Sequence, residues 1–123
     1  MIAATALLDA HTSLAWFVVV GNGLAGLWAL AAHWIEALRV KALWTFTAVV
    51  EVSIFVQVAL GVATMNLDDV EAPQFHLFYG FVAIVAVGLI YSYRNHLKSR
   101  LYLLYGGGGL FLMGLGIRAM LLA

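Results

Sequence analysis

Four long apolar stretches, separated by short charged segments, constrain this sequence more than any other feature. The second stretch contains one formal charge, Glu51, and the other three contain none. A helix needs about 20 apolar residues to cross the roughly 30 Å hydrocarbon layer of a membrane. The stretches are close to this length or exceed it, and they cover residues 10–35, 42–67, 72–93 and 101–117.

Composition agrees with a membrane protein and excludes several classes of site. Of the 123 residues, 65% are apolar and only 10% are charged, whereas a soluble domain carries about 25% charged residues. The chain has no cysteine, which excludes disulfides, thiolate metal sites and covalent c-type haem attachment. The formal net charge is zero, so we expect no nucleic-acid partner.

The stretches predict an all-α fold, an integral membrane four-helix bundle forming a single transmembrane domain over residues 1–123. Lipid offers backbone amides no hydrogen-bond partner, so spanning segments are helices or strands of a closed barrel, and four strands are too few for a barrel. No Lys or Arg precedes the first stretch, and it is too long for a signal-peptide core, so we expect it to be retained. The predicted helices cover about 11–35, 42–66, 74–95 and 100–122.

The basic residues are distributed unequally between the segments that join these helices. The links after the first and third helices are basic, whereas the link after the second holds Asp68, Asp69 and Glu71. Basic links stay in the cytoplasm, so both termini and the acidic link are expected outside, in a bacterial inner (plasma) membrane. The cytoplasmic links are predicted to be those with Arg39, Lys41, Arg94, Lys98 and Arg100.

Two histidines stand where they could bind a metal cofactor. His11 opens the first predicted helix and His76 the third, and these helices run in the same direction, so both imidazoles should lie at one depth near the outer face. Imidazole is a common ligand of haem iron, and bundles hold cofactors between facing helices. We predict that His11 and His76 ligate one haem b; the alternative is two interfacial histidines bonded to water or headgroups. His33 and His96 belong to the opposite end, where we expect solvated side chains.

Two further residues are candidates for contacts with such a haem. Gly80, one turn after His76, would make room for the flat ring. Arg118 would contact a propionate, because its guanidinium fork matches a carboxylate. The alternative for Arg118 is an outer carboxylate (Asp68, Asp69 or Glu71) or extension of its charged end toward water.

Three more of the polar residues inside the apolar stretches are candidates for a role, because polar groups at this depth are often functional. Asn22 and Glu51 lie near the centres of their helices, and Gln57 follows on the second. A buried Asn needs a partner, so one interpretation is an Asn22–Glu51 hydrogen bond with a protonated carboxyl. The other is a site for protons or a quinol.

One part of the sequence, from the end of the second predicted helix to the start of the third, carries a resemblance to a known family. The stretch Gln57-Val58-Ala59-Leu60-Gly61, followed by an acidic link and then Phe75-His76-Leu77-Phe78-Tyr79-Gly80, is similar to a helix ending and a haem-ligating histidine of the haem A synthase family. The resemblance implies a haem-b-binding four-helix unit similar to one half of the synthase or to cytochrome b561. The chain departs from the family in length and in lacking a Glu-x-x-His-Arg motif, so catalysis by the isolated chain is not implied.

These patterns leave three functions open. The first is electron transfer between quinol and a partner through a haem b. The second is a non-catalytic accessory or assembly subunit that packs its glycine-rich helices against a larger respiratory or transport complex, or against further copies of itself, among membrane lipids. The third is a small proton-coupled transporter that uses Asn22, Glu51 and Gln57. We expect no independent enzyme, since no catalytic pair or phosphate loop is found.

Overall fold

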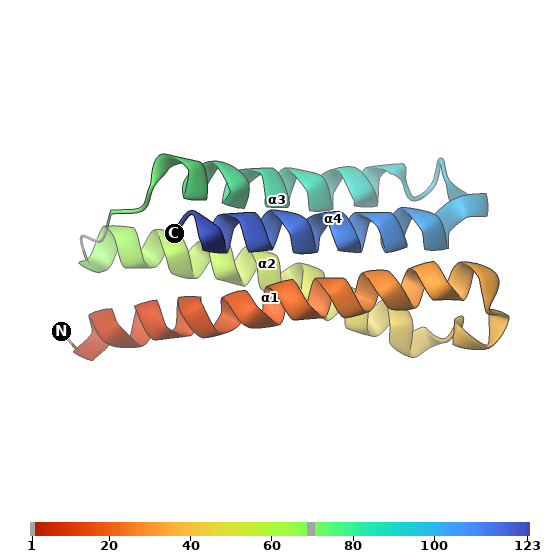
Figure 1. Ribbon diagram of the computed structural model, residues 1–123, viewed down its shortest axis with the longest axis horizontal. Coiled ribbons are helices and arrows are strands. Elements are labelled where there is room, and N and C mark those ends of the chain that lie inside the picture. Colours follow the sequence, from red (N-terminus) through yellow and green to blue (C-terminus); the bar gives the residue numbers. More distant parts are fainter. Residues whose placement is uncertain (1, 69–70) are drawn as a thin grey trace.

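The computed structural model describes residues 2–68 and 71–123, with side chains from 6 to 67 and from 71 onward. Within these residues the chain is helical and contains no strand, which confirms the all-α prediction. The four α-helices in the described part of the chain are each long and apolar enough to cross a membrane. The order is α1 (Ile2–Trp34), η1 (Glu36–Leu38), α2 (Lys41–Asp68), α3 (Gln74–Tyr93), η2 (Lys98–Arg100) and α4 (Leu101–Leu121) (Figure 1).

The predicted start of the first helix was wrong. α1 begins at Ile2 rather than near residue 11, because no glycine or proline interrupts residues 2–10 and Asp9 is their only charge. His11 therefore lies in the third turn of a long helix rather than at its end. The start of α3 was correct: Pro73 directly precedes Gln74, where its missing N–H is tolerated.

The helices run alternately up and down (Figure 1). The two termini and the α2–α3 link lie at one end of the bundle, and the other two links lie at the opposite end. The five basic residues of those two links therefore share one end, and Glu71 lies at the other.

Arg39 fastens the turn between α1 and α2. Its Nε donates to the carbonyl of Ala32 (2.7 Å) and its Nη2 to that of His33 (2.8 Å). Carbonyls in the last turn of a helix lack hydrogen-bond partners within the helix, and the guanidinium supplies a donor to two of them. The same guanidinium lies 5.1 Å from the centre of the Tyr102 ring, which links this turn to α4.

Glycines bring the backbones of α1 and α4 into direct contact. A Cβ added at Gly109 would lie 2.7 Å from the Cα of Gly26, and one added at Gly106 would lie 2.9 Å from the backbone of Leu30. Small residues allow such approach between apolar helices, where packing rather than water exclusion drives association. α2 packs on α1 and α3 on α4, whereas α2 and α3 contact each other little.

We expect Gly109→Ala to destabilise the bundle, because the methyl group would meet backbone that cannot rotate away. Overpacking of this kind costs about 1–3 kcal/mol. Gly107→Ala is the matched control, since no described atom lies within 4 Å of a Cβ at that position. Denaturant titration of the detergent-solubilised protein measures both. Equal stability of the two variants would contradict the close α1–α4 packing.

Candidate cofactor site at the histidine pair

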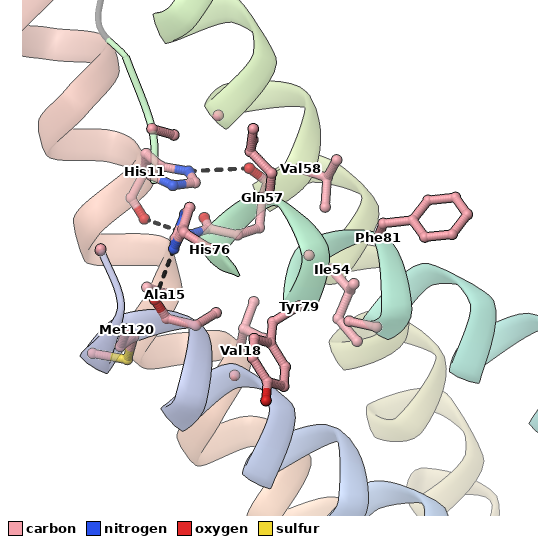
Figure 2. A pocket seen from close by; sticks show the side chains of 18 of the residues that line it. His11, Ala15, Val18, Ile54, Gln57, Val58, His76, Tyr79, Phe81 and Met120 are labelled. Carbon is pink, nitrogen blue, oxygen red and sulfur yellow. Dashed lines mark hydrogen bonds between the residues drawn. The ribbon is translucent and has the colours of Figure 1, made fainter. Parts of the chain in front are cut away.

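A cavity of about 530 Å³ lies between the four helices, toward the end that holds the termini. This volume is within the range of small-molecule and cofactor sites, about 300–1,000 Å³. Its walls are mostly apolar and include Val18, Ile54, Leu112 and Leu115. His11, Gln57 and His76 bring polar groups into it (Figure 2). A largely apolar cavity with a few convergent polar groups is typical of a binding site.

His11 is held against α2 by its ring nitrogen. Its Nδ1 lies 3.1 Å from the backbone oxygen of Gln57. A carbonyl oxygen can only accept a hydrogen bond, so this contact places the ring hydrogen on Nδ1. Gly61 makes the approach possible, because a Cβ there would lie 3.0 Å from His11 Cε1.

Gln57 returns the contact from α2 to α1. Its side-chain Nε2 donates to the backbone oxygen of His11 over 2.8 Å, so the two residues are joined by a reciprocal pair of hydrogen bonds (Figure 2). The other amide atom of Gln57, Oε1, is buried and has no hydrogen-bond partner among the described residues. A buried acceptor without a partner is costly, which marks this position as one suited to a ligand or a water molecule.

His76 is oriented in the same manner from α3. Its Nδ1 lies 2.7 Å from the backbone oxygen of Ala119 in α4. The hydrogen again belongs on Nδ1, and the other ring nitrogen, Nε2, carries the lone pair. Metal-binding histidines usually donate their second ring N–H to a carbonyl or carboxylate in this way, which fixes the tautomer.

The two imidazoles lie close together. Their ring centroids are 6.0 Å apart and their planes are inclined by 78°. Two imidazoles that bind one metal ion from opposite sides, each at about 2 Å through Nε2, would have centroids about 6 Å apart, which is close to the observed separation. The described residues contain no group of three or more His, Cys, Asp or Glu side chains able to hold a bare metal ion.

Gly80 and Arg118, the other two residues predicted to contact a haem, differ in where they lie relative to the cavity. Gly80 lines the cavity. Arg118 is exposed and does not belong to the described lining; it follows the open face of α4 that carries Gly107 and Gly114. Of the carboxylates considered for it, Asp69 lies outside the described residues, as does the side chain of Asp68.

Asn22 and Glu51, the polar residues near the centres of their helices, differ from the expectation of a hydrogen bond between them. Asn22 is buried and donates to the carbonyl of Val18 in its own helix over 2.8 Å. Between residues 6 and 67 the structure has no hydrogen bond from Asn22 to Glu51, so that expected pair is not formed. The i to i−4 bond satisfies Asn22 locally and removes its need for a partner on α2.

The histidines of the opposite end remain apart from the cavity. His33 packs edge-on against Trp34, with ring centroids 4.7 Å apart, and His96 is exposed near Tyr93. The sequence pointed to Gly61 only within the Gln57–Gly61 stretch and did not predict its contact with His11, nor the role of the carbonyls of Gln57 and Ala119. Gly61 follows Gln57 by four residues, so helical spacing places both on one face of α2. A backbone acceptor cannot be identified from the sequence, because every residue has one.

Comparisons with protein-family models, with curated proteins and with solved structures find no match to this chain.

We expect the imidazoles of His11 and His76 to carry a hydrogen on Nδ1 in the ligand-free protein. The carbonyls of Gln57 and Ala119 require the hydrogen there, and His33 and His96, at the other end of the bundle, serve as internal references. Nitrogen NMR of protein labelled at histidine distinguishes the tautomers. Signals of Nε2-protonated rings at both positions would contradict the described hydrogen bonds.

Proposed function

We propose that this chain is an integral membrane protein that binds one haem b between His11 and His76 and transfers electrons near the outer face of the membrane. The observation that carries the proposal is the histidine pair. The ring centroids are 6.0 Å apart, and each Nδ1 is held by a backbone carbonyl. Both Nε2 lone pairs therefore stand available for iron.

The surroundings of the pair support a flat apolar ligand. Gly61 leaves room for the His11 ring, and Gly80 lines the same cavity from α3. Val18, Ile54 and Leu115 would contact the ring and exclude water from it. A bound haem supplies an iron that gains and loses one electron, and the surrounding polarity is one of the means by which a protein tunes its potential.

The distribution of charge supports the proposed orientation. The basic links, with Arg39, Lys41, Arg94, Lys98 and Arg100, would face the cytoplasm of a bacterial cell. The histidine pair lines a cavity that is also lined by the α2–α3 link and the C-terminal Ala123, and these lie at the opposite end from the basic links. The site would then exchange electrons with a quinol dissolved in the bilayer or with a partner complex. The resemblance of the Gln57–Gly80 region to haem A synthase is consistent with a haem-binding unit but not with its oxidation chemistry.

We expect His11→Ala and His76→Ala each to abolish the spectrum of a six-coordinate haem, because each removes one axial ligand. His33→Ala and His96→Ala are the matched controls, since both lie at the other end of the bundle, and neither should change the spectrum. The measurement is a reduced-minus-oxidised absorbance spectrum of the purified protein, with a pyridine haemochrome assay for stoichiometry.

A flat spectrum from folded protein supplied with haem would overturn the proposal. A colourless chain that co-purifies with a large membrane complex would indicate the accessory subunit instead. A colourless chain whose transport in vesicles is lost on Glu51→Gln would indicate the proton-coupled transporter.

We expect Gly61→Val to weaken haem binding by displacing the His11 ring. Overpacking of about 1–3 kcal/mol corresponds to a roughly 5- to 150-fold loss of affinity. Gly88→Val is the matched control, because a Cβ at Gly88 meets no described atom within 4 Å. Haem titration followed at the Soret band measures both affinities, and equal affinities would show that the His11 ring does not depend on the space at Gly61.

A further inference from the structure

The seam between α2 and α3 is the loosest in the bundle. Its one close glycine is Gly80, where an added Cβ would lie 4.0 Å from Cγ2 of Val58. At the tight α1–α2 and α3–α4 seams, a Cβ added at Gly21 or Gly108 would lie 2.9 Å from Val50 or 2.5 Å from Ile90. The α2–α3 seam therefore has space at a position where the other seams have none.

This seam borders the cavity and reaches the outer surface of the bundle. Side chains from both helices line the cavity and are also exposed, with fractions of 47% for Val62, 43% for Leu77 and 66% for Phe81. Figure 2 shows Phe81 projecting away from the histidines. Residues that belong to both surfaces mark an opening between them. Val58 and Val62 lie within the apolar span of α2, so this opening would face hydrocarbon rather than water.

The end of the cavity that would face water is less suited to a haem. Glu71, Ala72 and Pro73 of the α2–α3 link line it there, together with the C-terminal Ala123. A haem carries two propionates, and the carboxylate of Glu71 would repel them. The apolar seam carries no charge against the flat ring, and the propionates, which are costly to bury in hydrocarbon, would stay at the level of the headgroups during passage.

We propose that the α2–α3 seam, formed by Val58, Val62, Leu77, Gly80 and Phe81, is a lateral portal through which haem passes between the outer leaflet and the histidine pair. This inference rests on the proposed function. It adds the route, which makes the bilayer rather than the aqueous phase the immediate source of the cofactor. Opening requires α2 and α3 to separate at their few contacts, while the tight α1–α4 packing stays intact.

The absence of native cysteine allows the portal to be closed with one engineered pair. In the variant Val58→Cys/Gly80→Cys, oxidation or a short disulfide-forming reagent ties α2 to α3, and a reducing agent releases them. The haem-free protein is placed in lipid nanodiscs, haem is added to the lipid, and the growth of the Soret band is followed. We expect uptake to slow by an order of magnitude or more in the tied state and to recover on reduction.

A second cysteine pair controls for the crosslink itself. Gly23→Cys/Met113→Cys ties α1 to α4, where a Cβ at Gly23 would lie 2.6 Å from Sδ of Met113, and it should leave uptake unchanged. Equal uptake by the tied and reduced α2–α3 variant would overturn the portal while leaving the proposed function standing. Failure of the native protein to take up haem would overturn both.

A milder substitution tests the same route without a crosslink. Val58→Ala widens the seam and should speed both haem uptake and haem loss to an apoprotein acceptor. Val52→Ala, an exposed position on α2 outside the cavity lining, is the matched control. Identical rates for the two alanine variants would overturn the portal even if the cysteine pair proved unable to fold.

Discussion

The close approach of α1 and α4 at Gly26 and Gly109 is the contact on which the rest of the structure depends. Apolar helices in lipid gain little from water exclusion, so association relies on dense packing and interhelical hydrogen bonds. The glycine contact fixes these two helices against each other. α2 then packs on α1, and α3 on α4, while α2 and α3 contact each other little, so the four helices surround one cavity with their weakest seam between α2 and α3.

Hydrogen bonds from side chains to backbone carbonyls connect the segments in addition to the glycine contact. His11 connects α1 with α2, and His76 connects α3 with α4, while Arg39 fastens the opposite end of α1. The two histidine bonds cross between helices beside an apolar cavity, where hydrogen bonds are strong and unpaired groups are costly. The polar groups of the site therefore hold the helices in register as well as lining the cavity.

Most of the architecture could be predicted from the sequence, because apolar runs of this length leave few alternatives. The four helices and the start of α3 after Pro73 follow directly from it. The beginning of α1 did not, because one charge at Asp9 does not stop a helix. The partner of Asn22 was also missed, because its own helix offers an acceptor one turn away, and a sequence does not rank that acceptor against a distant carboxyl. The sequence pointed to the two histidines of the site but not to the backbone carbonyls that orient them. Every residue has a backbone carbonyl, so the sequence does not single out the two that accept these hydrogen bonds.

The sparse contact between α2 and α3 has a mechanical consequence. Because α2 and α3 make few contacts, the half of the bundle formed by α1 and α2 is joined to the half formed by α3 and α4 chiefly through the glycine contacts between α1 and α4. A ligand bound by His11 of α1 and His76 of α3 would contact both halves and hold them together. Because it would bind only the assembled bundle, its binding energy would add to folding stability in proportion to the logarithm of its concentration. The cofactor would then be part of the architecture, and supply of the ligand would govern how much folded protein the membrane holds.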